Sequence, residues 1–249
     1  MDSELYDTLD GRVAPDTGAN RGIGPEIAHG LAELGATVYG GVRDPTSLST
    51  PDIRPVWMDV TEMTTIESAL GTVANEVGRL DVLVNNARIA PGAGRSLAEE
   101  PIEEIDEVLA VHLKGPIIVT KRSLPLLQNR SGARIANVSS GRGALDEGMS
   151  GGAPASRISK SGLNALTVHL HGEFGEELVV NAVCPGGSGR NWADRTRLDP
   201  RKQGRKPRSG CVDSNPEAGA ARSGGTGRSF PGERSPGPYR TGREFDNGP

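Results

Sequence analysis

The stretch Thr17-Gly18-Ala19-Asn20-Arg21-Gly22-Ile23-Gly24 decides the fold that we expect for this 249-residue chain. Its three glycines stand between a predicted strand, 12–17, and a predicted helix that carries Ile23, Ile27, Leu31 and Leu34 on one face. Glycine has no side chain to keep the backbone away from a ligand, and a helix N-terminus offers unpaired N–H groups with a partial positive charge. The stretch therefore predicts a site for the diphosphate of a nucleotide cofactor. Glycine spacing alone also fits an ordinary loop, so the rest of the chain has to decide.

Apolar runs of strand length alternate with helical patterns through the first three quarters of the chain. Further strands are predicted at 36–42, 54–58, 80–84, 134–139 and 178–184, and further helices at 64–77, from about 102 to 113 and beyond, and at 156–171. This alternation predicts βαβ units and a doubly wound α/β fold of the Rossmann type with a parallel sheet. Pro15 and Asp16 are unfavourable within the first predicted strand, because proline lacks the N–H that pairs with a neighbouring strand and aspartate would bury a charge.

The composition of the chain changes sharply after Gly186. Residues 1–186 hold 15 Lys and Arg against 25 Asp and Glu, whereas residues 187–249 hold 13 against 7 and only two branched aliphatic residues. A segment with so few apolar side chains cannot offset the entropy of ordering it. We therefore predict a nucleotide-binding domain over 1–186 and a disordered tail over 187–249.

Composition also narrows the partners that we expect. Cys184 and Cys211 suggest neither a disulfide framework nor a metal-ligand cluster, so no metal is predicted. No apolar run is long enough to span a membrane, and we expect a cytoplasmic protein without a membrane partner. The positive tail leaves a nucleic-acid arm as an alternative, but its few aromatic and interspersed acidic residues favour no nucleic-acid partner.

Short polar motifs follow successive predicted strands, at the edge where open parallel sheets bind ligands. Asp59-Val60-Thr61 follows the third strand, Asn85-Asn86-Ala87 the fourth and Ser139-Ser140 the fifth. Ser159-Lys160 lies in the next helix, and Pro185-Gly186 follows the sixth strand. Each motif alone has a simple reading, as a helix cap, a turn or a solvated charge. Together and in this order they are specific.

From about Arg12 to Gly186 this ordered set resembles the classical short-chain dehydrogenase/reductase family, most closely its carbonyl reductase-like branch. The family pattern is a TGxxxGxG loop, a D-V pair, an NNAG motif, a catalytic serine, a YxxxK pair and a PG turn. The resemblance implies an oxidoreductase that transfers hydride between NADP and a small-molecule carbonyl or alcohol substrate. It assigns Ser140 to the substrate carbonyl, and Lys160 to the nicotinamide ribose and to lowering the pKa of a neighbouring phenol.

The resemblance also implies the cofactor-binding residues. They are Gly18, Arg21, Gly22, Ile23 and Gly24 for the diphosphate, Asp59 and Val60 for the adenine, Asn86 and Ala87 for the middle of the cofactor, and Pro185, Gly186 and Lys160 for its nicotinamide end. Arg43, after the second strand, and Arg21 would place guanidinium groups where the 2′-phosphate of NADP sits, whereas NAD would favour a carboxylate there. We expect NADP and keep NAD as the alternative, in which both arginines are ordinary surface charges.

Two of the four catalytic positions depart from the family pattern. The YxxxK tyrosine is Ser156, whose alkyl hydroxyl is shorter and far less acidic than a phenol. The family's helix asparagine is His112, which could relay protons or simply pack. Arg88 replaces the NNAG glycine, and we expect its side chain to crowd a cofactor. These departures support a second hypothesis, a catalytically inactive remnant that binds nucleotide.

The tail does not continue the family pattern after Pro185-Gly186. A one-base shift of the reading frame permits family-like residues over 187–194 and again around 199–211, so we hypothesise an out-of-frame translation from Gly187 onward. Resequencing the gene through the codons for Gly186 and Gly187 tests this idea. The family's substrate lid and last strand would then be missing, which leaves the substrate unidentified and makes a homo-oligomer doubtful.

Overall fold

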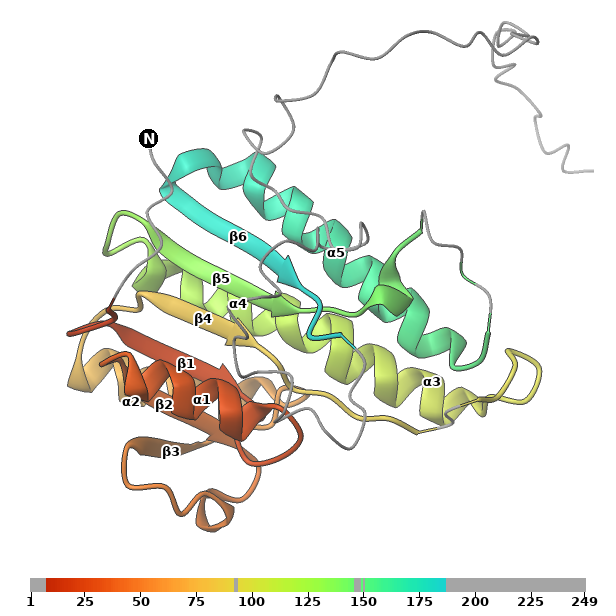
Figure 1. Ribbon diagram of the computed structural model, residues 1–249, viewed down its shortest axis with the longest axis horizontal. Helices are drawn as coiled ribbons and strands as arrows, with labels where there is room; N and C mark the ends of the chain where they lie inside the picture. Colours follow the sequence, from red (N-terminus) through yellow and green to blue (C-terminus); the bar gives the residue numbers. More distant parts are fainter. Residues whose placement is uncertain (1–7, 92–93, 146–148, 150, 187–249) are drawn as a thin grey trace, which may run out of the picture. The chain divides into compact units, whose positions relative to one another are not determined.

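The computed structural model describes residues 8–91, 94–145, 149 and 151–186. In this part of the chain six parallel strands form one sheet in the order β3-β2-β1-β4-β5-β6 (Figure 1). The strands are β1 (Val13–Thr17), β2 (Thr37–Val42), β3 (Ile53–Trp57), β4 (Val82–Asn85), β5 (Ala133–Val138) and β6 (Leu178–Val183). The strand order reverses between β1 and β4, and a crevice for a ligand is expected where the carboxyl ends of these two strands diverge.

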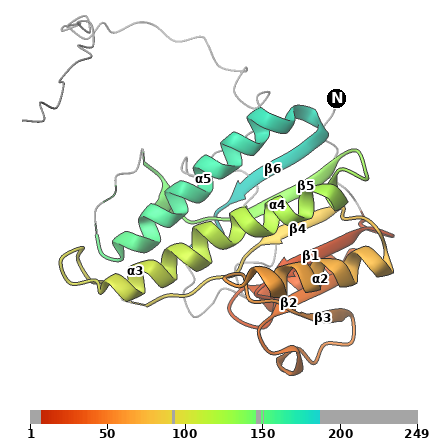
Figure 2. The same cartoon turned by 180° about the vertical axis from the view of Figure 1, so that it is seen from behind.

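Helices cover both faces of the sheet, which confirms the doubly wound α/β prediction. Figure 1 shows α1 in front of the sheet, and Figure 2 shows α2, α4 and α5 across the opposite face. The helices are α1 (Gly24–Glu33), α2 (Met63–Glu76), α3 (Ile102–Leu109), α4 (Gly115–Leu127) and α5 (Pro154–Phe174). A π-helical segment, η2 (Ala110–Lys114), joins α3 to α4, and short 3₁₀ turns occur at η1 (Pro45–Ser47), η3 (Gly141–Gly143) and η4 (Gly175–Glu177).

Two apolar layers follow from this arrangement, one on each face of the sheet. The larger layer buries Ile66, Leu83 and Val119 beneath α2, α4 and α5. The smaller layer holds alanines and valines of β1, β2 and β4 against α1, whose Ile23, Ile27 and Leu31 pack on it as predicted. The prediction was wrong for Leu34, which is 46% exposed because the helix ends one residue earlier.

Strand β1 forms without interruption although it contains Pro15 and Asp16. It pairs with β2 along five residues, whereas its register with β4 is defined at Asp16 and Val84 alone, in keeping with the missing N–H of Pro15. Asp16 is 0% exposed, and neither carboxyl oxygen has a hydrogen-bond partner among the described residues. Burial raises the pKa of Asp16 well above its usual value, by more than the neighbouring Asn86 side chain lowers it, so the buried carboxyl favours its neutral form.

Several predictions fall on residues that the structure does not describe. The disordered tail over 187–249, the missing lid and last strand, the out-of-frame hypothesis and Cys211 all lie outside the described residues. Within 8–186, as far as it is described, no helix combines the length and apolar character that crossing a membrane requires. The same residues contain no group of three or more His, Cys, Asp or Glu side chains that could hold a metal ion.

Candidate functional site

The glycine-rich loop after β1 folds tightly onto the loop after β4. Gly18 and Gly22 have φ angles of 80° and 66°, in the left-handed region that favours glycine. A Cβ at Gly18 would lie 3.0 Å from the Cα of Ala87, and a Cβ at Gly24 would collide with the carbonyl oxygen of Gly18. The first and third glycines are therefore needed for close backbone packing, and the second for a left-handed turn.

Thr17 and Asn86 join the two loops at the point where the strand order reverses. The Thr17 hydroxyl accepts hydrogen bonds from the backbone N–H groups of Asn86 and Ala87, at 3.0 and 3.1 Å. The Asn86 amide donates to the carbonyl oxygens of Thr17 and Gly18, at 3.0 and 3.3 Å. This network holds the carboxyl ends of β1 and β4 in a fixed geometry, and the predicted NNA motif thus positions backbone as well as lining the site.

The N-terminus of α1 faces the same region without a capping side chain. Ile23 occupies the N-cap position and makes no side-chain cap, while the N–H of Gly24 donates to the carbonyl oxygen of Arg21 at 3.2 Å and Pro25 has no N–H. A Cβ at Gly22 would meet no atom within 4 Å, so the space beside the loop is open. The positive end of the helix dipole, next to this open space, is the kind of place where proteins hold phosphate groups.

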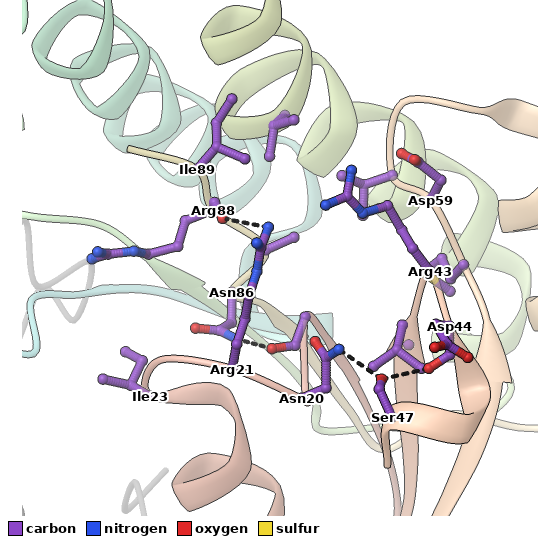
Figure 3. A pocket seen from close by; sticks show the side chains of 17 residues that line it. Asn20, Arg21, Ile23, Arg43, Asp44, Ser47, Asp59, Asn86, Arg88 and Ile89 are labelled. Atoms are coloured by element: carbon purple, nitrogen blue, oxygen red, sulfur yellow. Dashed lines mark hydrogen bonds between the residues drawn. The ribbon is translucent and has the colours of Figure 1, made fainter. Parts of the chain in front are cut away.

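A cavity of about 290 Å³ lies at this edge of the sheet (Figure 3). The predicted residues that line it are Gly18, Arg21, Ile23, Arg43, Asp59, Val60, Asn86 and Ala87. Sequence reasoning missed Asn20, Gly41, Val42, Asp44, Ser47, Met58, Ile89 and Val111, and had assigned no binding role to Arg88, which also lines the cavity. Most of the missed residues lie within a few positions of a predicted strand end, so a site extended by one turn would have included them.

Five of the predicted cofactor residues do not line this cavity. They are Gly22, Gly24, Lys160, Pro185 and Gly186. The two glycines shape the loop as described above, and Pro185 and Gly186 are exposed directly after β6. Gly22 and Gly24 thus belong to the loop that lines the cavity, Pro185 and Gly186 follow a strand that does not line it, and Lys160 belongs to a separate group of side chains on α5.

The charges that line the cavity are three arginines without an ion pair to a described residue and two carboxylates that each accept hydrogen bonds from a nearby threonine. Asp44 accepts from the N–H and hydroxyl of Thr46, and Asp59 accepts from the N–H and hydroxyl of Thr61. Arg21 donates to the carbonyl oxygen of Arg88 at 3.4 Å. The Arg43 and Arg88 guanidinium groups form no ion pair with the residues that the structure describes. Three arginines against two engaged carboxylates make the cavity attractive to anions.

Lys160 is buried beside the carboxyl end of β5. It is 7% exposed, and its Nζ donates to the carbonyl oxygen of Val138 at 2.6 Å. Burial first, and the positive charge of Arg88 second, lower the pKa of Lys160 to about 8. The ammonium group is thus partly held by backbone, and it can lose its proton within about a pH unit of neutrality.

His112 is buried in the π-helical segment η2 and is 3% exposed. Its Nε2 accepts the backbone N–H of Ile89 at 3.0 Å, which assigns the ring proton to Nδ1, 3.3 Å from the Ser159 hydroxyl. Ser159 in turn donates to the carbonyl oxygen of Ser156 at 3.0 Å. Burial, with the charge of Lys160 next in size, lowers the pKa of His112 to about 4, so the ring is neutral at pH 7.

The remaining catalytic candidates lie on either side of the contact between η3 and α5. Ser140 caps η3, and its hydroxyl accepts the N–H of Arg142 at 3.2 Å, whereas the neighbouring Ser139 is buried and donates to Asn164. Ser156 is half-buried in the first turn of α5. Ser156 and Lys160 lie in the first two turns of α5 and Ser140 precedes η3, which packs against that helix, but no hydrogen bond between described side chains joins the three directly.

Comparison with known proteins gives a family and several relatives. A family model described as short chain dehydrogenase matches residues 12–199. Short chain dehydrogenase pigC of Monascus ruber is 33% identical over 194 residues, which cover 72% of this chain and 63% of that protein. The 3-oxoacyl-[acyl-carrier-protein] reductase FabG of Thermotoga maritima is 33% identical over 188 residues, 72% of this chain and 74% of that protein.

Solved structures show the same architecture. A Pseudomonas aeruginosa RhlG/NADP active-site complex matches with a TM-score of 0.67 and 30% identity, covering 76% of this chain and 79% of that one. A 3-ketoacyl-(acyl-carrier-protein) reductase from Brucella melitensis, complexed with NADH, matches with a TM-score of 0.66 and 25% identity over 72% of this chain and 77% of that one. The chain spans 63%, 42% and 66% of three of its curated relatives.

Proposed function

Because this chain belongs to the short chain dehydrogenase family, we propose that it binds NADP and transfers hydride between that cofactor and a small carbonyl or alcohol compound. The observation that carries the proposal is the cation-rich cavity at the carboxyl ends of β1, β2 and β4, behind an uncapped helix N-terminus. The residues present fit a dinucleotide, because a tightly packed glycine loop and the positive end of the α1 dipole meet three arginines there.

Arg43 supports NADP over NAD. Its guanidinium lines the cavity at the end of β2 and makes no ion pair with a described residue. Asp44, the next residue, already accepts two hydrogen bonds from Thr46 and caps η1. The ribose end of the cavity therefore offers a free cation and an engaged carboxylate, a combination that favours a 2′-phosphate. The relatives include both an NADP and an NADH complex, so the preference rests on Arg43.

The nicotinamide, when bound, supplies or accepts the hydride, and the chain's own residues position the substrate and handle the proton. Ser140 is proposed to donate its hydroxyl to the substrate oxygen, with the positive charge of Lys160 nearby to stabilise negative charge there. His112 is a positioning residue in this proposal, because its neutral ring holds Ile89 and Ser159 in place. Ser156 stands where a proton donor is needed, and an alkyl hydroxyl is a poor acid.

Ser156 is also the specific observation that favours a second candidate function, a nucleotide-binding protein without catalysis. Both candidates share the cofactor site and differ only in proton transfer. The free thiol of Cys184, whose sulfur accepts the N–H of Gly141 at 3.2 Å, supports our proposal of a reducing, cytoplasmic location. An oligomeric state stays open, and a metal or nucleic-acid partner is not proposed.

The test measures NADPH binding by fluorescence titration and NADPH oxidation across a panel of aldehydes and ketones. Both are measured for the natural chain and for Ser156→Tyr. We expect binding in both proteins and a turnover at least about 100-fold higher in Ser156→Tyr, because a positioned general acid contributes about 10²–10⁴-fold. Binding without turnover in either protein would favour the second candidate. Absence of NADPH binding would contradict both.

A further inference from the structure

Arg88, like Arg43, is a cavity residue whose guanidinium forms no ion pair within the described part of the chain. Its side chain is exposed and lines the cavity, and only its backbone oxygen takes part in a hydrogen bond, from Arg21. The two carboxylates of the cavity, Asp44 and Asp59, are each held by a neighbouring threonine. An arginine directed at a cavity without an internal partner is well suited to bind an anion from solution.

Arg88 and Arg43 serve different ends of the cavity. Figure 3 shows the Arg43 side chain beside Asp59. The Arg88 side chain extends away from both, toward the side of the picture where Ile23 lies, the residue that precedes α1. The charge of Arg88 also contributes to lowering the pKa of Lys160 and of His112. The Arg88 charge therefore acts on Lys160 and His112, and its side chain extends in another direction than that of Arg43, the residue proposed for the 2′-phosphate.

We propose that Arg88 binds an anionic group of the substrate, so that this protein prefers carbonyl or alcohol compounds that carry a carboxylate or a phosphate. The inference rests on the proposed function, because a bound dinucleotide is what leaves only the Arg88 end of the cavity for a substrate. The cofactor's diphosphate would have other partners, namely the glycine-rich loop with the positive end of the α1 dipole and the guanidinium of Arg21. Arg88 is thus free for a second anion.

The test is a ligand-observed NMR titration of the protein saturated with NADP⁺, a form in which no carbonyl reduction takes place. Two matched pairs serve as probes, 4-oxopentanoate with 4-oxopentanamide, and dihydroxyacetone phosphate with dihydroxyacetone. We expect the charged member of at least one pair to bind about three- to tenfold more tightly, because the contact is charge-assisted but exposed to solvent. The preference is expected to shrink in 0.5 M salt.

Arg88→Gln removes the charge and is expected to remove the preference, with the Kd of the neutral member unchanged. Lys121→Gln is the matched control, since Lys121 is an exposed cation on α4 that does not line the cavity, and it should keep the preference. Equal binding of charged and neutral members in the natural chain would overturn the proposal. So would an Arg88→Gln protein that keeps the preference, and if that protein also binds NADP⁺ at least tenfold more weakly, Arg88 belongs to the cofactor site.

Failure of the proposed function gives a different result. If calorimetry detects no binding of NADP⁺ to the natural chain, the proposed function is wrong, and the same titrations are run on the chain alone. A preference for the charged probe that disappears in Arg88→Gln still supports an anion site at this residue. Absence of such a preference in the chain alone overturns the anion site as well.

Discussion

At the scale of single residues, His112 shows how burial controls charge. Its pKa is lowered to about 4 from an ordinary 6.5, so the folded protein binds fewer protons than the unfolded chain between these values. The stability that His112 contributes is fully present above pH 6.5 and is lost as the pH falls through 4. The loss reaches about 3 kcal/mol at 1.36 kcal/mol per pKa unit.

We therefore predict that His112→Asn flattens the acid limb of the stability curve. Urea unfolding of both proteins at intervals from pH 4 to 7 measures the free energy of unfolding, and the difference between the two curves isolates His112. The natural chain should lose stability more steeply toward pH 4 than the variant. Parallel curves would mean that His112 is already protonated, or freely solvated, in the folded protein.

The position of Arg43 leads to a prediction on the relative affinities for NADP⁺ and NAD⁺. Arg43→Gln keeps a polar side chain at the end of β2 but removes the cation that faces the cavity. We expect the Kd for NADP⁺ to rise about 10- to 100-fold, since hydrogen bonds to charged groups contribute about 1.5–3 kcal/mol. The Kd for NAD⁺ should change less than about threefold. Titration calorimetry with both nucleotides decides this, and equal losses for the two would refute a role at the 2′-phosphate.

At the scale of elements, alternation of apolar runs was enough to predict the six strands and the helices between them. It was not enough to show that the predicted helix from 102 consists of α3, the π-helical η2 and α4. Pro116 offers no N–H to the carbonyl of His112, and the wider spacing of η2 accommodates that gap, a local adjustment that periodicity does not reveal. Similarly, the pattern did not reveal that the Asn20 amide donates a hydrogen bond to the hydroxyl of Ser47, a residue 27 positions further along the chain that also lines the cavity.

The buried carboxyl in strand β1 leads to a prediction on the free energy of unfolding. Asp16→Val should raise the free energy of unfolding by about 1–3 kcal/mol at pH 7, because it removes a buried carboxyl without a described partner. The raised pKa of Asp16 means that its contribution to stability is present below its unfolded pKa and lost as the pH rises through the folded one. The gain from the substitution should therefore be smaller at pH 4 than at pH 7.

Urea unfolding at both pH values measures this gain, and Asp16→Asn, which keeps the shape but cannot ionise, separates charge from polarity. A variant that is less stable than the natural chain at pH 7 would show that Asp16 has a favourable partner in the folded protein.

At the scale of the whole molecule, the two ends of the sheet have separate tasks. The carboxyl ends of the strands surround the cavity, while the amino ends are joined through Asp81, whose side chain is 0% exposed. This carboxylate pairs with Arg12, Arg79 and Arg130 and accepts the N–H of Val13 at 3.0 Å. Four residues of β4, roughly 13 Å of strand, separate it from the binding loops.

This division predicts that Asp81→Asn lowers stability without changing cofactor affinity. Loss of one partner from a buried ionic group should cost about 2–4 kcal/mol, because three guanidinium groups lose their common acceptor. Urea unfolding measures that cost, and titration of the folded variant with NADPH should give a Kd within about twofold of the natural chain. Arg43→Gln provides the reciprocal case, with weaker NADPH binding and a change in stability of less than about 0.5 kcal/mol, as is usual for an exposed side chain. If Asp81→Asn weakened NADPH binding as much as stability, the geometry of the cavity would depend on the amino ends of the strands, and the two ends would not be independent.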